Sequence, residues 1–359
     1  MRSRFARVAA AVAPTVALLV LFELGLRAFP HRLPVDVGIA LHSVYGEGPG
    51  DIYFRDRPTR SRFLWPDFET QAYWNGYLWQ HRTDELGFRN PEGLADRSLV
   101  LLGDSMIYGH GVDEEDTVAH FLRSEHGLGA YNAGRQGDTL YQEYLVARIL
   151  LPRLRPKTLA LTVFLNDFED VEIYRTPQEI ASPPELALDV DALVARLDEP
   201  ERSSKWSKQL HRFKLWRLVQ FVWQRARSRS GGEGEAPATR ELSSFLSAIT
   251  DDARFAPVAR YYETLIADLA RRAREQGTEL VLLQLDVGDH FVPGAIAAQD
   301  RVRSLLESIG KQNQLRVLTT RSVFAGCSEC FLLNDGHLRR EGHRRLAALL
   351  AAELAPPRS

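Results

Sequence analysis

The sequence has 359 residues, of which 45% are hydrophobic and 26% are charged, and its 45 Lys and Arg nearly balance its 47 Asp and Glu. A chain of this size and composition can bury a substantial core, as one large domain with appendages or as two modest domains. Its near-neutral charge gives no indication of a nucleic acid as partner.

Residues 1–30 are the most unusual segment, because three arginines precede the run VAAAVAPTVALLVLF, which has no charge until Glu23. A helix from Val8 to Phe29 would be roughly 33 Å long at ~1.5 Å per residue, enough to cross a bilayer. The small residues before Pro14 lie too early for the cleavage site of a signal peptide, which is the alternative. We therefore predict an uncleaved anchor in a single-pass membrane protein, with the main body outside the cytoplasm, periplasmic or at the cell surface.

Residues 31–96 are irregular and rich in aromatic side chains. Within them the run AYWNGYLWQ places Asn75 and Gly76 between aromatic residues. An Asn-Gly pair is typical of a type I′ turn, because that turn needs positive φ at both central positions. We predict a lead-in hairpin that packs on the main domain.

The main domain, residues 97–355, alternates short apolar runs with helical patterns. The predicted strands are SLVLLGD, GAYNAG, TLALTVFLND, TELVLLQLD and LRVLTT. Such alternation implies parallel pairing through right-handed crossovers, so the predicted fold is α/β: a doubly wound, flavodoxin-like parallel sheet of five strands with helices on both faces. In these sheets ligands bind beyond the carboxyl ends of the strands.

Residues 174–253 interrupt this alternation and are predicted to be a helical and linker insertion. A basic, aromatic stretch, KWSKQLHRFKLWRLVQFVWQRARSR, precedes the flexible run SGGEGEAPA. The basic helix has two interpretations: it rests on an anionic membrane surface, or it packs as a lid with its charges in water.

Polar residues follow the first three strands at the predicted active edge. Asp104 and Ser105 follow the first strand, NAGRQGDT spans the end of the second, and Asn166 follows the third. Close to the C-terminus, LLNDGHLRREGH places Asp335 and His337 in a loop before the last helix. These segments together contain the residue types of a nucleophilic site.

A serine hydroxyl needs a base within hydrogen-bonding reach and a third group that fixes the tautomer of that base. Ser105 is the candidate nucleophile, His337 the base and Asp335 the third group. Residues two apart point to the same side only in an extended segment, so this Asp-Gly-His must be non-helical, which Gly336 makes easy.

Three donors are candidates for an oxyanion hole: the backbone N–H groups of Ser105 and Gly137 and the side-chain amide of Asn166. Taken singly, Ser105 reads as a helix N-cap, Gly137 as a turn glycine and Asn166 as a cap residue. Only their occurrence together, in this order, favours catalysis.

The set resembles the SGNH, or GDSL, hydrolase family: Ser105 in its GDS block, Gly137, Asn166 in an Asn-Asp pair, and His337 match the four blocks. LGFRN before the first strand also looks like the membrane-anchored bacterial branches. One departure is that Asn334 occupies the commoner place of the acid, whereas Asp335 has the shorter spacing of branches that resemble the polysaccharide-acetylation enzymes.

The resemblance implies acyl-ester chemistry without a metal or organic cofactor. The expected substrate is an acyl ester, such as acetyl groups on carbohydrate or lipid and, by analogy, on envelope polysaccharide. Resolution of the acyl enzyme by water would make an esterase, and resolution by a sugar hydroxyl an acyl transferase. The alternative is a catalytically silent, glycan-binding module that keeps the fold.

The only two cysteines, Cys327 and Cys330, are too few for a disulfide scaffold or a four-cysteine zinc site. They lie a few residues before Asp335. They are either a free pair or a local disulfide, and we favour a structural bridge, which would stiffen the candidate catalytic loop in an oxidising compartment.

Overall fold

The central sheet of the protein has five parallel strands in the order β6-β5-β7-β8-β9. They were located in a computed structural model that describes residues 2–47, 51–199, 210, 213–228, 245–287, 294–333 and 335–354. The strands are β5 (Leu99–Leu102), β6 (Ala130–Asn132), β7 (Thr158–Val163), β8 (Glu279–Gln284) and β9 (Arg316–Thr319). Each lies within one of the five predicted apolar runs, and the order is that of flavodoxin-like sheets. The predicted α/β fold is confirmed.

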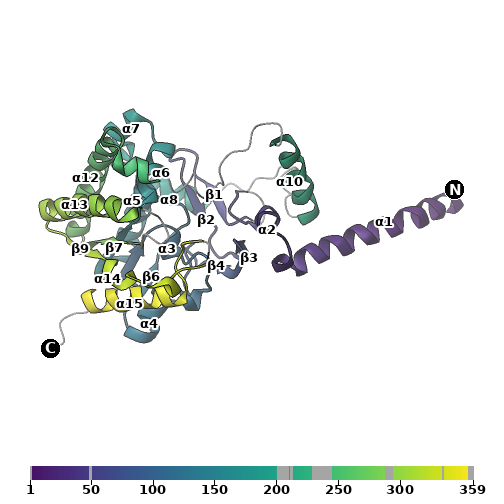
Figure 1. Ribbon diagram of the computed structural model, residues 1–359, viewed down its shortest axis with the longest axis horizontal. Coiled ribbons are helices and arrows are strands. Elements are labelled where there is room, and N and C mark those ends of the chain that lie inside the picture. The colour runs from purple at the N-terminus through teal and green to yellow at the C-terminus, as the bar shows by residue number, and fades with distance from the viewer. Residues whose placement is uncertain are drawn as a thin grey trace.

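Helices cover both faces of this sheet (Figure 1). On one face α4 (Val118–His126) packs against α15 (Arg340–Leu354), and on the other α12 (Asp252–Glu275) packs against both α5 (Leu140–Leu154) and α13 (Ala295–Asn313). The shorter helices α3 (Ser105–Tyr108), α6 (Asn166–Tyr174) and α14 (Arg321–Phe324) begin just after strands. Because both faces are covered, the strands are apolar on both sides, as their continuous runs predicted.

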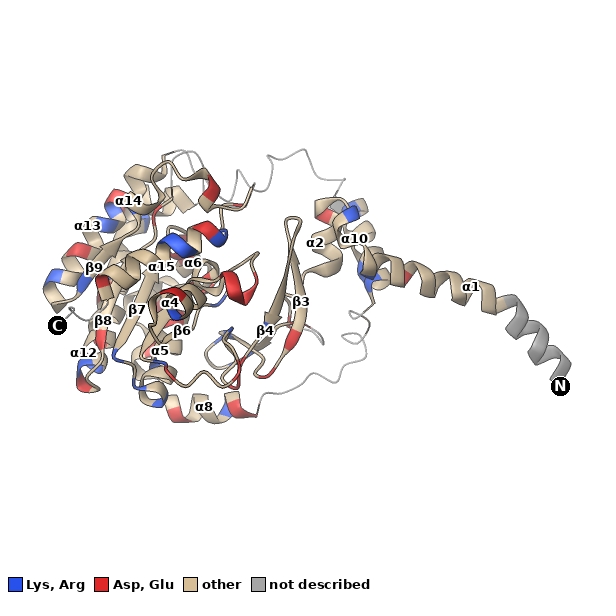
Figure 2. Ribbon diagram, turned by 90° about the horizontal axis from the view of Figure 1, so that it is seen from below, with Lys and Arg blue, Asp and Glu red and all other residues tan. Residues whose placement is uncertain are grey.

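Two antiparallel hairpins precede the sheet. The first pairs β1 (Tyr53–Arg55) with β2 (Arg62–Leu64), and the second pairs β3 (Glu69–Trp74) with β4 (Tyr77–Arg82). In the second turn Asn75 has φ of 46° and Gly76 of 91°, the positive values that the Asn-Gly pair predicted. Figure 2 shows this hairpin standing beside the strand-and-helix body, between it and α2 (Val35–His42).

The insertion is helical where it is described. It contains α7 (Pro177–Ala181), α8 (Val190–Asp198) and α10 (Lys214–Ser228), whereas the predicted SGGEGEAPA linker lies outside the described residues. Helix α10 packs on α2 and α1 (Arg2–Ala28). Its cations do not all face water, as the second interpretation expected: Lys214 Nζ donates to Leu41 O at 3.0 Å, and Arg217 pairs with Asp51 at 2.9 Å.

Short 3₁₀ turns occur at Pro30–Arg32, Glu114–Asp116, Pro184–Ala187 and Ser328–Cys330.

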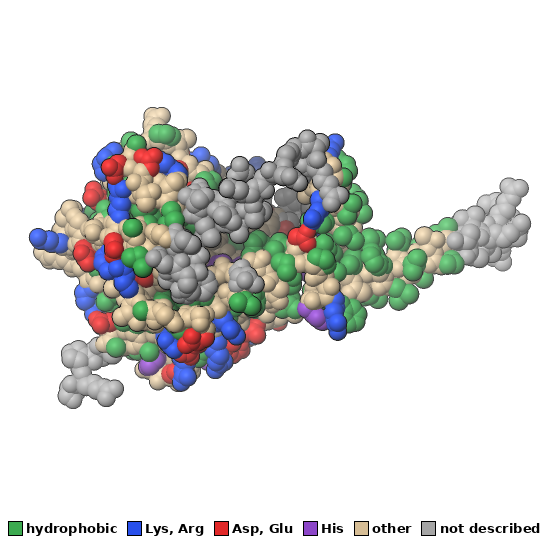
Figure 3. All heavy atoms as spheres, in the orientation of Figure 1, with side chains coloured by type: hydrophobic (Ala, Val, Ile, Leu, Met, Phe, Trp, Pro, Cys, Tyr) green, Lys and Arg blue, Asp and Glu red, His purple; other side chains and the backbone are tan. Residues whose placement is uncertain are grey.

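The N-terminal segment forms a helix, but the structure corrects its predicted role. Among the described residues no helix is both long and apolar enough to cross a membrane, so the predicted single-pass anchor and the localisation based on it are wrong. The apolar run is broken by Glu23, whose carboxylate accepts hydrogen bonds from the backbone N–H groups of Lys214 and Leu215 at 3.0 and 2.8 Å. Figure 3 shows apolar side chains along the described part of α1; the exposed large ones are Val12, Val16, Leu18, Leu19, Val20, Leu21, Phe22 and Leu24.

Candidate active site

Ser105 is the first residue of α3, directly after β5. Asp104 caps this helix, because its Oδ1 accepts a hydrogen bond from Met106 N–H at 2.9 Å. The cap fixes the start of α3 and with it the position of the serine hydroxyl. The Oγ of Ser105 lies 2.8 Å from Nε2 of His337.

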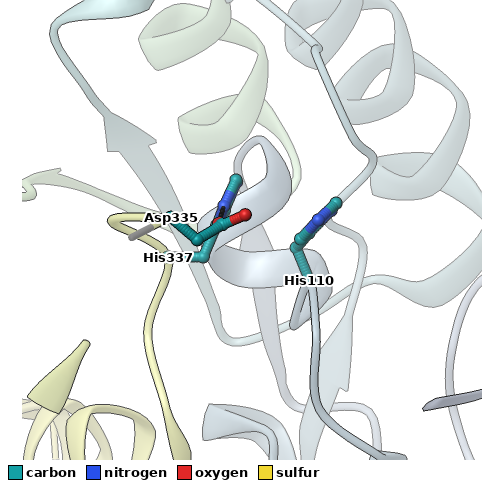
Figure 4. Close-up of side chains that lie close together, drawn as sticks. All are labelled: His110, Asp335 and His337. Carbon is teal, nitrogen blue, oxygen red and sulfur yellow. Dashed lines mark hydrogen bonds and ion pairs between the residues drawn. The ribbon is translucent and has the colours of Figure 1, made fainter. Parts of the chain in front are cut away.

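His337 and Asp335 come from a loop between β9 and α15, 232 and 230 residues after Ser105 in the chain. A bridge between Phe331 and Leu338 closes the loop, and Leu332 N–H donates to His337 O at 2.7 Å. Gly336 adopts φ of 81°, so the segment is non-helical, as predicted. Nδ1 of His337 is hydrogen-bonded to Oδ1 of Asp335, and the two side chains lie side by side in Figure 4.

The disulfide predicted as one interpretation of the cysteine pair is present. Cys327 and Cys330 are bonded immediately before the loop that holds Asp335. The carbonyl of Cys330 accepts a hydrogen bond from Arg339 N–H at 2.8 Å, on the far side of the same loop. The disulfide therefore lies where the candidate catalytic loop begins.

Asp335 is ionised at neutral pH. Burial raises its pKa, but hydrogen bonding to His337, the charge of His337 and a hydrogen bond from Asn75 outweigh burial, and the pKa falls to about 2. A carboxylate in this state accepts the Nδ1 proton of His337, which leaves Nε2 free to accept the proton of Ser105.

His110 is a further member of the site, and the sequence analysis did not identify it. Its ring stacks on that of His337 with centroids 4.2 Å apart and planes 21° apart (Figure 4). Gln136 Nε2 lies 2.7 Å from His110 Nδ1. Burial, followed by repulsion from His337, lowers the pKa of His110 well below its ordinary value, so the ring is neutral. The only signal in the sequence is a histidine between two glycines after the GDS block, which is not specific.

The other predicted oxyanion residues lie close to these groups. Asn166 is the first residue of α6, and its side chain is hydrogen-bonded to Asp104, next to Ser105. Gly137 has φ of 66° and follows Gln136 in the loop between β6 and α5. This loop adjoins the nucleophile strand, because Arg135 N–H donates to Gly103 O at 3.0 Å. Their roles as oxyanion donors stay predictions.

One group of described side chains has the residue types of a metal site: His110, Asp335 and His337 offer ligand atoms within 4.8 Å of one another. Two observations oppose that use. Nearly parallel stacked rings direct their nitrogen lone pairs side by side rather than toward a common point. Both oxygens of Asp335 also have hydrogen-bonding partners, His337 and Asn75. Asn334, the alternative position for the acid, lies outside the described residues.

No protein-family model matches the sequence, and neither does any curated protein. Comparison with solved structures gives a different result. The chain is similar to structures of GDSL-family lipases and esterases. A structure of TesA is also similar: it is 15% identical, with 72% of this chain and 98% of that chain covered at a TM-score of 0.40.

Two further GDSL-type and esterase structures have comparable values. The psychrotrophic esterase EstA from a Pseudoalteromonas species is 12% identical over 72% of this chain and 98% of that chain, with a TM-score of 0.39. A GDSL-like lipase from Bacteroides thetaiotaomicron is 12% identical over 72% and 88%, with a TM-score of 0.36. These names describe those proteins alone.

Proposed function

We propose that this protein is a serine hydrolase of the SGNH, or GDSL, type that acts on ester bonds. The observation that carries the proposal is the continuous hydrogen-bonded relay from Ser105 Oγ to His337 Nε2 and from His337 Nδ1 to Asp335. Ser105 begins α3 directly after β5, and Asp335 and His337 lie in the loop before α15, at the carboxyl edge of the sheet, where ligands bind in folds of this kind. A relay of these three groups is the arrangement that activates a serine hydroxyl.

In the proposed reaction Ser105 Oγ attacks the carbonyl carbon of an ester, and its proton passes to His337 Nε2. The ionised Asp335 stabilises the imidazolium that forms. His337 then delivers the proton to the leaving alcohol as the carbon–oxygen bond breaks, which leaves the acyl group on Ser105. Water, or a second alcohol, gives a proton to His337 and attacks the acyl enzyme, which yields an acid or a new ester and restores the serine.

The negative charge on the carbonyl oxygen needs fixed donors. We assign this role to the backbone N–H groups of Ser105 and Gly137 and to the amide of Asn166. The support is that Asn166 contacts Asp104 beside the nucleophile and that the Gly137 loop is bonded to Gly103. Removing one such donor typically raises the barrier by about 3 to 4 kcal/mol.

The proposed substrates are acyl esters, including acetyl esters of carbohydrates or lipids. Either water or a sugar hydroxyl can accept the acyl group from Ser105. The assembled relay favours this enzyme over a catalytically silent glycan-binding module, because binding alone does not require an imidazole between a hydroxyl and a carboxylate.

Hydrolysis of p-nitrophenyl acetate by the wild-type protein and by Ser105→Ala tests the proposal. Ser124→Ala is the matched control, because Ser124 is an exposed helical serine whose Oγ donates to His120 O. The proposal expects loss of activity only in Ser105→Ala, and equal rates in all three proteins would contradict it. Labelling with a fluorophosphonate, followed by mass spectrometry, is expected to modify Ser105; modification of another serine would overturn the site.

A further inference from the structure

The turn of the β3–β4 hairpin reaches the candidate catalytic acid. Asn75 Nδ2 donates a hydrogen bond to Asp335 Oδ2 at 2.6 Å, across 260 residues of sequence. Because His337 bonds the other oxygen of the same carboxylate, Asp335 has a partner on each side. The Asp335 side chain is only 1% exposed, so its orientation depends on these protein groups.

The backbone of the turn explains why an asparagine occupies this position. Asn75 lies in the left-handed region, with φ of 46°, which Gly, Asn and Asp adopt more readily than most other residues. Among these three only Asn has a neutral side-chain donor. Position 75 therefore combines a turn residue with a neutral hydrogen-bond donor to a carboxylate.

The hairpin also supports His110, the residue stacked on His337. The rings of Trp79 and Trp74 of the hairpin lie 4.8 and 5.9 Å from that of His110, and Tyr45, which lies between α2 and β1, stacks 5.7 Å from it with planes 28° apart. His110 is thus enclosed by aromatic rings on the hairpin side and faces His337 on the other. A neutral ring in this place can support the imidazolium of His337 without adding a second positive charge.

Arg89 fixes the loop that carries His110 to the same hairpin. Its guanidinium is fully buried and donates to Tyr108 O and Gly109 O at 2.9 and 2.8 Å. It also donates to Val112 O and to Gln80 O of β4, both at 3.0 Å. One side chain therefore joins the loop on both sides of His110 to the hairpin.

We propose that the β3–β4 hairpin is part of the catalytic apparatus, with Asn75 and His110 as positioning residues that hold Asp335 and His337 in line with Ser105. This inference rests on the proposed function. It gives the aromatic lead-in segment a role in the reaction, in addition to its packing.

The electrostatic surroundings of the pair come from several elements. Several charged or titratable side chains interact electrostatically with His337 or with the stacked ring of His110. They are Asp335 from the same loop, Asp104 before α3, His110 itself after α3, His343 of α15 and Arg89. Asn75 adds a donor to this set without adding charge, which distinguishes it from the other groups.

Substitutions at Asn75 test the proposal. Asn75→Gly keeps a residue suited to the turn and removes the amide, and it is expected to lower kcat about tenfold with KM within about twofold, the signature of lost positioning. Asn75→Asp also suits the turn but places a second carboxylate against Asp335. It is expected to lose more activity than Asn75→Gly at high pH, where both carboxyl groups are ionised.

The matched control is Gln80→Ala. Gln80 Nε2 donates to Glu69 Oε1 at 2.8 Å on the exposed side of the same hairpin, so this variant also loses one amide-to-carboxylate hydrogen bond. Its kcat is expected to stay within about twofold of wild type, because the substitution keeps the backbone carbonyl of Gln80 that Arg89 binds. Equal losses in Asn75→Gly and Gln80→Ala would mean that the hairpin matters only for stability, and would overturn the proposal.

A second pair of variants tests His110. His110→Phe keeps a flat ring against His337, whereas His110→Ala removes it, so the Phe variant is expected to retain the higher kcat. Thermal unfolding of both variants shows whether they fold. A His110→Ala variant that folds and keeps wild-type kcat would overturn the role of the stack.

A readout independent of turnover separates this proposal from the proposed function. The proton between His337 Nδ1 and Asp335 is expected to give a low-field proton NMR resonance, identified by its loss in His337→Gln. The resonance is expected to shift upfield or broaden in Asn75→Gly and to stay unchanged in Gln80→Ala. An unchanged resonance in Asn75→Gly contradicts the positioning role, whether or not the ester is hydrolysed; absence of hydrolysis by wild type contradicts the proposed function instead.

Discussion

Arg135 and Asp138 form a buried ion pair inside the loop that carries Gly137. Arg135 Nε donates to Asp138 Oδ2 at 2.6 Å, and the two side chains are 1% and 7% exposed. Arg135 also donates to Gln142 O at 3.4 Å, so its guanidinium ties the loop to the first turn of α5. The pair thus fixes the segment that we propose contributes an oxyanion donor.

Replacing Arg135 with methionine is expected to lower the free energy of unfolding by about 3 to 5 kcal/mol, because it leaves Asp138 buried without its cation. Urea unfolding at about pH 8, above the folded-state pKa of Asp138, measures this change. Arg153→Met is the control: its partner Asp198 is 3.3 Å away and 62% exposed, so a loss of less than about 1 kcal/mol is expected. Similar losses of unfolding free energy in the two variants would show that the buried ion pair contributes no more to stability than the exposed one.

Glu143 is a buried residue of α5 that interacts electrostatically with this ion pair, and it is expected to make the stability of the protein depend on pH. It is 1% exposed, and neither of its carboxylate oxygens has a hydrogen-bonding partner among the described residues. Burial raises its pKa well above the ordinary value, and repulsion from Asp167, Asp104 and Asp138 adds to this effect. The pKa of Asp138 itself is raised to about 7, with burial as the main cause.

In the folded protein the Glu143 carboxyl keeps a proton that the unfolded chain releases. Its contribution to stability is therefore complete below about pH 4 and is lost as the pH rises through its folded-state pKa. Glu143→Gln removes this group, so the stability of the variant relative to wild type is expected to increase from about pH 5 to about pH 8. Urea unfolding across this range measures the difference.

Glu125→Gln is the control for this titration, because Glu125 is a surface residue paired with Arg344 at 2.9 Å. Its stability relative to wild type is expected to show no such increase. If the unfolding free energies of Glu143→Gln and wild type change in the same way with pH, then Glu143 is not protonated in the folded state and the electrostatic account is wrong.

The central sheet could be predicted because its signal is local. Each strand is a short apolar run, and burial on both faces requires such runs in consecutive residues. The turn at Asn75 was predicted for the same reason, since positive φ restricts the residue itself. The partner of its side chain is 260 residues away, and no local pattern contains that contact.

The buried face of each helix was harder to predict from the sequence, for a related reason. The periodicity of residues around Trp216 and Trp223 predicts the helix that became α10, but it does not define which neighbour covers which face. In the structure Lys214 and Arg217 turn toward α2, while Trp223 is 55% exposed. The prediction of an N-terminal anchor was wrong: it included Glu23 in a spanning helix from Val8 to Phe29, and the sequence does not show that α10 supplies two hydrogen bonds to that carboxylate.

The disulfide at the base of the catalytic loop allows a direct redox prediction. A bridge between Cys327 and Cys330 closes a very short loop, for which the chain-entropy estimate is about 2 kcal/mol. Reduction with dithiothreitol is expected to lower the free energy of unfolding by about this amount in wild type. The Cys327→Ala/Cys330→Ala double variant is expected to be insensitive to the reductant, and equal sensitivity would show that the bridge does not form in solution.

The last prediction concerns the close approach of the Gly134 loop to the nucleophile helix. A Cβ on Gly134 would lie 2.3 Å from Tyr108 N and 2.7 Å from Ile107 C, both backbone atoms of α3 that cannot move without displacing Ser105. Gly134→Ala is therefore expected to cost about 1 to 3 kcal/mol in unfolding free energy and to lower ester hydrolysis. Gly25→Ala is the control, because a Cβ there meets no described atom within 4 Å. A Gly134→Ala variant with wild-type stability and activity would mean that the β6–α5 loop does not constrain the helix that presents Ser105.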